Sequence, residues 1–266
     1  MAIFLTVTGT TWVTPVIKRV LFRTDDLSAF RTSEYTDRYV KLVFPKPGVV
    51  YPEHLDVKAM RGTIPPEEMP DVRTYTALFP DVEAGTLAID FVIHGDEGIA
   101  GPWAAQAQPG DVLQVNGPGG AYRPAPDADW YLLVGDESAL PAIVAALDAL
   151  DPNASGHLFL LVENPDQQPV LRGPHGIVLH FVHRSDNDGG DGQLARAVQT
   201  LDWPEGRVDA FVHGEAQEVM HTLRPWLKND KGLTRDQLSI SGYWRRGRTE
   251  DGFRVWKSEL ARAEAE

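Results

Sequence analysis

The chain has 266 residues, no cysteine and a formal net charge of −13, from 25 Lys and Arg against 38 Asp and Glu. This is the composition of an ordinary globular protein of one or two domains. Because the first 129 residues and the remainder are both acidic, non-specific nucleic-acid binding is not expected. Without cysteine there is no disulfide, thiolate zinc site or iron–sulfur cluster, so any redox chemistry must reside in a bound organic cofactor or in the substrate.

Targeting and membrane signals are not evident in the sequence. Residues 1–21 have no basic residue ahead of an apolar run, unlike a signal peptide. No stretch approaches the roughly 18 consecutive apolar residues of a membrane helix. We therefore expect a cytoplasmic location and no membrane insertion.

Up to about Gly120 the pattern is that of β-strands. Short runs rich in Val, Ile, Thr and aromatic residues alternate with Pro, Gly and Asp turns. The predicted strands are Phe4–Val7, Val13–Phe22, Tyr39–Phe44, Arg73–Phe79, Thr86–Val92 and Asp111–Asn116, with one short helix at Pro102–Gln108. This spacing predicts an antiparallel β-barrel over residues 1–124.

The segment Arg123–Asp129 lacks large apolar residues and contains two prolines, which predicts an interdomain linker. After it, strands and helices alternate, which predicts a doubly wound parallel sheet over 130–266. The predicted strands are Trp130–Val134, His157–Val162, Ile177–Val182, Val208–Val212 and Gln237–Ser241. The predicted helices are Ser138–Leu150, with Ser138 as N-cap, Gly192–Leu201 and Glu215–Leu227.

A first candidate site is the tetrapeptide Arg73-Thr74-Tyr75-Thr76 in the barrel half. On a strand Arg73 and Tyr75 share one face and Thr76 lies on the other. These residue types can pair with a pyrophosphate, stack on a flat ring and hydrogen-bond a ring nitrogen. An exposed strand with ordinary cross-strand pairs is the alternative.

A second candidate follows about 20 residues later. It runs from Asp90 through Val92, His94 and Gly95, and then through Gly101, Pro102, Trp103 and Ala104. A glycine-rich turn that leads into a helix exposes backbone N–H groups to an anion. A capped connecting loop remains the alternative, and His94 alone suits a strand-end histidine bonded to backbone.

The second half carries three further candidates. Gly135-Asp136-Glu137-Ser138-Ala139 joins a buried strand to a helix, without the three-glycine dinucleotide fingerprint, and its spacing does not fit a hydrolase nucleophile elbow. Tyr243, Trp244, Arg245 and Arg246 follow the last predicted strand, where a parallel sheet binds ligands.

Arg184 and Ser185 end another strand and can bind a ribose phosphate, although a plain loop fits equally. His180 and His183 lie on opposite faces of that strand, which argues against a metal site.

Taken in order, these motifs resemble the siderophore-interacting protein family, a branch of the ferredoxin-NADP reductase superfamily. The resemblance covers nearly the whole chain and rests on five segments. These are Arg73-Thr74-Tyr75-Thr76, Asp90-Phe91-Val92-Ile93-His94-Gly95, Pro102–Ala105, Gly135–Pro141 and Gly242-Tyr243-Trp244-Arg245-Arg246-Gly247.

The resemblance implies an FAD-binding barrel at 1–124 and an NAD(P)H-binding α/β domain with a basic, aromatic C-terminal segment at 130–266. It implies that Arg73, Tyr75 and Thr76 hold the flavin, that His94 and Gly95 line its site, and that the backbone of Pro102–Ala104 receives the pyrophosphate. Two features depart from the family pattern: Leu78 stands where relatives often have a second arginine, and Gly101-Pro102-Trp103 is more compact than usual.

The implied activity is transfer of electrons from NAD(P)H through FAD to a ferric siderophore, with release of ferrous iron. A flavin joins a two-electron donor to a one-electron acceptor, and reduction weakens the hold of hard oxygen ligands on iron. The alternatives are a ferredoxin-dependent or general flavin reductase, and a non-enzymatic siderophore or haem carrier.

Two further expectations concern selectivity. Arg184 and Ser185, with Arg245 or Arg246, are predicted to select NADPH over NADH through the charge of the 2′-phosphate. Lys46, Arg246 and Lys257 are predicted to form a basic patch that docks an anionic ferric siderophore.

Overall fold

The computed structural model describes residues 2–52, 54–93, 95, 98–187, 191–247 and 252. The chain divides into two compact units, residues 1–121 and 122–266. The predicted linker 123–129 thus belongs to the second unit. His94 and Lys257, two of the predicted site residues, lie outside the described residues.

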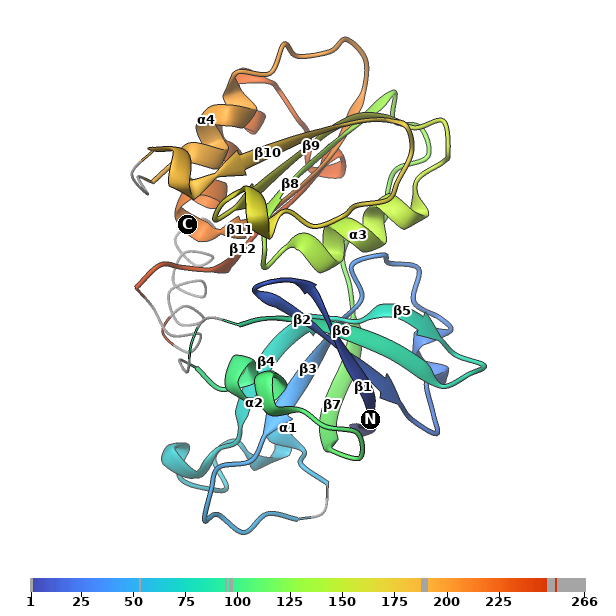
Figure 1. Cartoon of the computed structure of the whole chain (residues 1–266), viewed down its shortest axis with the longest axis vertical. Helices are drawn as coiled ribbons and strands as arrows, with labels where there is room; N and C mark the ends of the chain where they lie inside the picture. The colour runs from blue at the N-terminus through green and yellow to red at the C-terminus, as the bar shows by residue number, and fades with distance from the viewer. Residues whose placement is uncertain are drawn as a thin grey trace. The chain divides into compact units, whose positions relative to one another are not determined.

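The first unit is built on one seven-stranded antiparallel sheet in the order β4-β3-β7-β1-β2-β6-β5 (Figure 1). Its strands are β1 (Ala2–Thr14), β2 (Ile17–Arg23), β3 (Tyr39–Phe44), β4 (Asp71–Thr76), β5 (Leu78–Asp81), β6 (Thr86–Val92) and β7 (Val112–Gly119). The helices are α1 (Val57–Met60) and α2 (Ala100–Gln106). Because a single residue separates the two outermost strands, β4 and β5, the sheet curls back on itself, which confirms the predicted barrel.

Inward-facing side chains of this sheet form the core of the first unit. In β2, Val20 and Phe22 are buried and Leu21 between them is 40% exposed, as the two-residue period of a strand requires. Phe91 on β6 is fully buried and contacts both Tyr75 and Trp103. The core therefore ties β4, β6 and α2 together.

Two predicted strands of the first unit are each divided in the structure. The run Val13–Phe22 is interrupted at Pro15 and Val16, where the Thr14 hydroxyl accepts hydrogen bonds from the backbone N–H groups of Val16 and Ile17. The β-branched residues on both sides of Pro15 made the two strands look like one in the sequence. The run Arg73–Phe79 is divided at Ala77, whose N–H donates to the carbonyl of Arg38 instead of a sheet partner.

The second unit holds a five-stranded, wholly parallel sheet in the order β10-β9-β8-β11-β12. Its strands are β8 (Trp130–Asp136), β9 (Ser155–Val162), β10 (Gly176–His183), β11 (Val208–Glu215) and β12 (Leu238–Trp244). The α-helices are α3 (Leu140–Ala149) and α4 (Gln193–Gln199), and wider π-type turns occupy Gln217–Leu223 and Trp226–Asp230.

Alternate residues of β8 serve the two faces of this sheet. Leu132 and Val134 join the core that includes Leu194 of α4, whereas Gly135, on the other face, lies under Ala139 and Ile143 at the start of α3. A Cβ at Gly135 would lie 2.7 Å from the Cβ of Ala139, so glycine is required there. The predicted doubly wound sheet is confirmed.

Local boundaries differ at three points. The helix α3 begins at Leu140 with Ala139 as N-cap, because the Ser138 hydroxyl is committed to Asp136. The predicted helix Glu215–Leu227 is made of two π-type segments on either side of Pro225. The last strand continues to Trp244, so Tyr243 and Trp244 lie on β12 rather than after it.

Candidate functional site

In the first unit, the predicted cofactor residues meet around Phe91. Tyr75 on β4 and Trp103 on α2 lie with their ring centroids 4.7 and 5.7 Å from that of Phe91. Gly101 sits against the end of β6, where an added Cβ would be 3.3 Å from the carbonyl oxygen of Val92. Three segments that are separate in sequence are thus neighbours.

The strand β4 is an outer strand of its sheet, and among the described residues one of its edges pairs with β3. Its other edge therefore presents backbone donors and acceptors beside Arg73, Thr74, Tyr75 and Thr76. Thr74 is exposed and Thr76 buried, while Arg73 and Tyr75 are half-buried. The Arg73 guanidinium donates to the carbonyl of Val72 and lies 3.7 Å from the Asp71 carboxylate.

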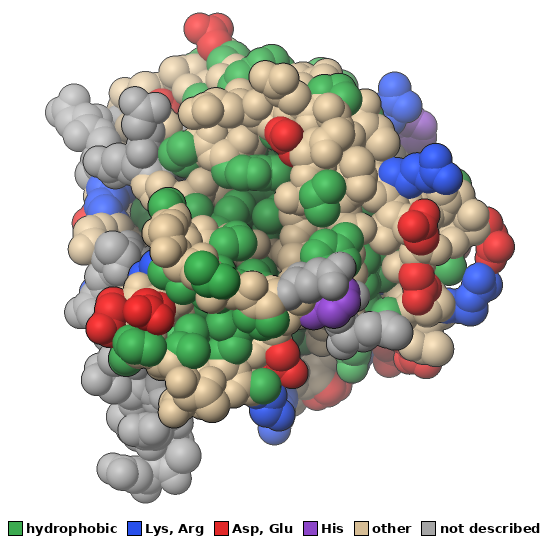
Figure 2. Space-filling view, turned by 90° about the horizontal axis from the view of Figure 1, so that it is seen from below, with side chains coloured by type: hydrophobic (Ala, Val, Ile, Leu, Met, Phe, Trp, Pro, Cys, Tyr) green, Lys and Arg blue, Asp and Glu red, His purple; other side chains and the backbone are tan. Residues whose placement is uncertain are grey.

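These residues fit a flavin nucleotide. An open strand edge suits the polar rim of the isoalloxazine, an aromatic side chain beside it suits the ring face, and a guanidinium suits a phosphate. Pro102 and Trp103 also line a shallow depression of about 560 Å³ with Gln106, Gln108, Asp111 and Val112. Figure 2 looks onto the first unit and shows hydrophobic side chains gathered around a hollow in its surface.

Two predicted contacts have structural roles inside the barrel. The Asp90 carboxylate is buried and binds Arg19, its cross-strand partner on β2, through two hydrogen bonds of 2.7 and 2.8 Å. Trp103 packs its indole in the core, near Phe22 and Phe44. The side chains of Asp90 and Trp103 therefore stabilise the fold around the candidate site.

In the second unit, every described site residue lies at the carboxyl edge of the parallel sheet. The strand order reverses between β8 and β11, because the chain leaves β8 toward β9 and β10 and then returns to β11. Such a reversal opens a crevice at the carboxyl ends of the two strands, where open α/β sheets bind their ligands. Asp136 ends β8 and Glu215 ends β11.

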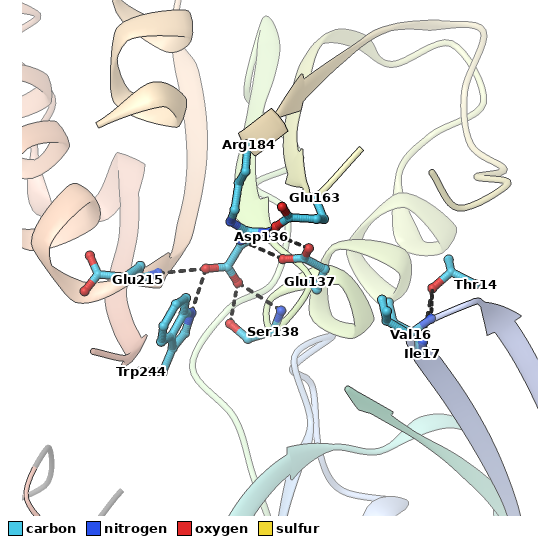
Figure 3. A network of polar contacts seen from close by, with 10 residues as sticks. All are labelled: Thr14, Val16, Ile17, Asp136, Glu137, Ser138, Glu163, Arg184, Glu215 and Trp244. Atoms are coloured by element: carbon cyan, nitrogen blue, oxygen red, sulfur yellow. Dashed lines mark hydrogen bonds and ion pairs between the residues drawn. The ribbon is translucent and has the colours of Figure 1, made fainter. Parts of the chain in front are cut away.

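The Asp136 carboxylate joins three strand ends (Figure 3). One oxygen accepts hydrogen bonds from the backbone N–H and the hydroxyl of Ser138. The other accepts from the backbone N–H of Glu215 at 2.9 Å and from the indole Nε1 of Trp244 at 2.7 Å. A side chain at Gly214 would collide with this carboxylate, since its Cβ would be 2.8 Å from Oδ2.

Asp136 is fully buried, and this burial raises its pKa above the ordinary value of an aspartate. The charge of Glu137 raises it further, while the hydrogen bonds from Ser138 and Trp244 and the charge of Arg184 act in the opposite direction. Desolvation is the largest of these effects, because burial disfavours the charged form of a carboxylate.

Arg184 follows β10 and is bound to Glu137 by two hydrogen bonds of 2.6 and 2.8 Å (Figure 3). Glu163, which follows β9, lies 3.9 Å from the same guanidinium. Burial acts to lower the pKa of Arg184, but the bonds and charge of Glu137 outweigh it and the pKa is raised. Arg184 is therefore a fixed cation with a carboxylate partner.

The remaining predicted residues lie around this network. Ser185 donates its N–H to the carbonyl of Glu163, and Ala139 is fully buried beneath the turn. Tyr243 packs beside His213, with ring centroids 4.8 Å apart. Arg245 bonds Gln217, and Arg246 pairs with Asp191 at 2.9 Å. Lys46, in the first unit, is half-buried in the turn after β3.

Sequence reasoning missed Glu215 and Glu163. The Glu215 carboxylate accepts hydrogen bonds from the N–H groups of Gln217 and Glu218 and so caps the helical segment that follows. For Glu163, the available signal was a carboxylate directly after the predicted strand His157–Val162, whereas Glu215 stands three positions after the predicted end of its strand at Val212. Within the described residues, no group of three or more His, Cys, Asp or Glu side chains is arranged to hold a metal ion, and no helix is long and apolar enough to cross a membrane.

Comparison with known proteins shows what this chain is similar to. Residues 6–122 match the family model of the siderophore-interacting FAD-binding domain, and residues 128–247 match that of the siderophore-interacting protein. An uncharacterized protein of Mycobacterium tuberculosis is 45% identical, over 97% of this chain and 95% of its own. Ferric vibriobactin reductase ViuB of Vibrio cholerae is 32% identical, over 91% and 89%.

An NADPH-dependent ferric-chelate reductase of Escherichia coli is 37% identical over 55% of this chain and 56% of its own. Among solved structures, a siderophore utilization protein from T. fusca superposes with a TM-score of 0.78 at 35% identity, covering 94% of each chain. With both parts of the chain matched by the family models and relatives aligned over nearly its full length, this protein belongs to the siderophore-interacting protein family.

Proposed function

We propose that this protein holds FAD in its first unit and reduces the ferric iron of a siderophore in the cytoplasm, using a nicotinamide nucleotide bound by its second unit. The observation that carries the proposal is the presence of two distinct sites in one chain. One is the open edge of β4 with its arginine and tyrosine, and the other is the crevice where the parallel sheet reverses its strand order. Relatives named as ferric reductases support the same reaction class.

In the first unit, the Arg73 guanidinium would neutralise a flavin phosphate, and Tyr75 would support a face of the ring. The chemistry that FAD held by these residues would supply is a link between a two-electron donor and a one-electron acceptor. The polypeptide supplies orientation: the Arg19–Asp90 pair fixes β2 against β6, and the Phe91 contacts fix β4 and α2.

In the second unit, the Asp136 network keeps the crevice in shape before a nucleotide arrives. It fixes the turn after β8, the end of β11 and the indole of Trp244 with one buried carboxylate. A preorganised site of this kind binds a ligand without first ordering its own loops.

The test begins with purified protein incubated with FAD and passed over a desalting column. Retained flavin absorbance is expected, followed by bleaching under anaerobic NADH or NADPH and by ferrous iron when a ferric siderophore is added with a ferrous-specific chelator. A protein that retains no flavin would contradict the proposal. Flavin that is reduced by nucleotide but leaves the siderophore iron ferric would indicate a general flavin reductase instead.

A further inference from the structure

The end of β9 carries a carboxylate at the place where dinucleotide sheets recognise a ribose. In the order β10-β9-β8-β11-β12, β8 is the first strand of the unit and β9 the second. An acidic residue near the end of the second strand commonly accepts the 2′-hydroxyl of an NAD ribose, whereas an available arginine nearby favours the 2′-phosphate of NADP. Glu163 is the residue that follows β9, and its side chain is 53% exposed.

The nearby arginine is already committed to a carboxylate. Both terminal nitrogens of Arg184 are bonded to Glu137, at 2.6 and 2.8 Å, in the fork geometry that gives such pairs their strength. The Glu137 side chain is 8% exposed, so solvent screens this pair little. Glu137 already neutralises this guanidinium, so a 2′-phosphate would have either to displace the buried carboxylate, which is costly, or to bind the remaining N–H groups of a neutralised cation.

The surrounding charges also oppose a phosphate. Glu163 lies 3.9 Å from Arg184, and Asp136 is close enough to influence the pKa of this guanidinium. Arg246, another candidate for the phosphate, is paired with Asp191 at 2.9 Å. A dianionic 2′-phosphate placed at Arg184 would therefore meet the carboxylates of Glu137 and Glu163 at the same guanidinium.

We propose that Glu163 accepts the 2′-hydroxyl of the donor's adenosine ribose and that the Glu137–Arg184 pair excludes a 2′-phosphate, so that the donor is NADH rather than NADPH. This rests on the proposed function and reverses the preference expected from the sequence. The expected preference for NADPH and the proposed preference for NADH both depend on Arg184. Its bidentate pairing with Glu137 favours NADH.

Binding of redox-inactive nucleotide fragments tests the proposal without any electron transfer. Isothermal titration of the FAD-loaded protein with ADP-ribose and with 2′-phospho-ADP-ribose should give at least about tenfold tighter binding of the unphosphorylated ligand, the effect of one charge-assisted hydrogen bond. Glu163→Gln should reduce the ratio of the two affinities. It should weaken binding of ADP-ribose about tenfold and reduce the repulsion of 2′-phospho-ADP-ribose.

Two further variants sharpen the result. Glu137→Gln, which leaves Arg184 without an anionic partner, should strengthen binding of the phosphorylated fragment. Glu205→Gln removes one charge from an exposed turn before β11, at the opposite edge of the sheet, and should change neither affinity. Because Glu137 is buried, thermal unfolding of each variant is measured alongside, and Glu163→Gln, at an exposed position, remains informative if Glu137→Gln unfolds.

Tighter binding of the phosphorylated fragment by the wild-type protein would overturn this inference and leave the proposed function standing, since NADPH would then be the donor. An unchanged ratio in Glu163→Gln would overturn the role of Glu163. If neither fragment nor NADH nor NADPH binds, the nicotinamide donor in the proposed function is itself wrong, and this inference falls with it.

Discussion

Arg73 is the residue of the first unit whose charge we propose to bind a phosphate of the cofactor. Its replacement by Ala should weaken FAD binding by about tenfold or more, because one charge-assisted hydrogen bond is lost. The measurement is the flavin content after gel filtration, together with a fluorescence titration of the stripped protein. Arg31→Ala is a matched control, since Arg31 forms an exposed ion pair with Glu83 in the same unit. Full retention of FAD by the Arg73 variant would remove this residue from the site.

A second residue-scale prediction concerns His157 and His180, whose ring nitrogens lie 3.1 Å apart on β9 and β10. Burial lowers the pKa of both below the usual value near 6.5, and for His157 the charge of His180 adds to this. A lowered folded-state pKa means that the unfolded chain binds protons first, so stability falls as the pH drops from about 6.5 toward the folded pKa.

Urea unfolding of the protein between pH 7.5 and 5 should show this loss, with a slope below the limit of about 1.4 kcal/mol per pH unit for each proton. His180→Gln should flatten the slope, because it removes one titrating group and the like-charge contact with His157. A variant with the slope of the wild-type protein would show that other groups are responsible.

At the scale of elements, Asp136 is expected to hold the carboxyl edge of the parallel sheet. Asn at this position offers one acceptor oxygen in place of two, so either the Ser138 pair or the Glu215 and Trp244 pair of donors loses its partner. We expect Asp136→Asn to destabilise the protein by about 1–3 kcal/mol in urea unfolding. Trp244→Phe, which removes a single donor, should cost about 1 kcal/mol.

The pH dependence of stability separates these two variants. The raised pKa of Asp136 means that the folded state retains its proton longer, so stability declines as the pH rises from about 4 through the folded pKa. Asp136→Asn should lack this decline and Trp244→Phe should keep it. Equal stability of Asp136→Asn and the wild-type protein across this range would contradict the role given to the carboxylate.

How far the sequence predicted these elements depends on the range of the interactions involved. Periodicity located the strands and the helices α3 and α4, because burial on one face is a local pattern. It failed at Pro15 and Val16, where a tight turn lies between two runs of β-branched residues, and at Ser138, whose hydroxyl bonds a carboxylate two residues away instead of capping a helix.

Site residues were predictable where a motif is contiguous and unpredictable where the partner is distant. Arg184 and Glu137 are 47 positions apart, so their pairing follows only from the strand order. The importance of Glu163 likewise depends on β9 being next to β8. The sequence placed these residues at strand ends, but which charges meet there follows only from the fold.

For the whole molecule, the net charge of −13 should oppose the approach of an anionic ferric siderophore unless basic side chains attract it locally. Lys46 and Arg246 remain the predicted contacts within the described residues, and Lys257, the third, lies outside them. The apparent KM for an anionic chelate should rise with ionic strength, because exposed charges are screened beyond roughly 10 Å at 0.1 M salt. A neutral siderophore serves as control, and equal salt responses for both would exclude the patch.

A further prediction concerns Tyr122 and the segment Arg123–Asp129 after it, which resembles a linker in sequence. Asp209 accepts hydrogen bonds from the Tyr122 hydroxyl and the Ala125 N–H, both at 2.9 Å, and the Tyr131 hydroxyl donates to the Ala125 carbonyl. Limited proteolysis with proteinase K should therefore spare this segment. Asp209→Ala should open it to cleavage, whereas Asp202→Asn, an exposed change in the same unit, should not. Rapid cutting there in the wild-type protein would contradict the prediction.

The same anchoring determines where this polypeptide can be divided. The backbone N–H of Ala121 is bound by Asp37 of the first unit, and the next residue, Tyr122, is bound by Asp209 of the second. A recombinant fragment that starts at Trp130 lacks the Tyr122 hydroxyl and the Ala125 N–H, which donate to Asp209. Its buried Asp209 carboxylate would lose both donors, and the fragment should fold poorly. A fragment that starts at Tyr122 keeps both donors. Exchange of nucleotide-binding halves between relatives should accordingly use the Ala121–Tyr122 peptide bond as its joint.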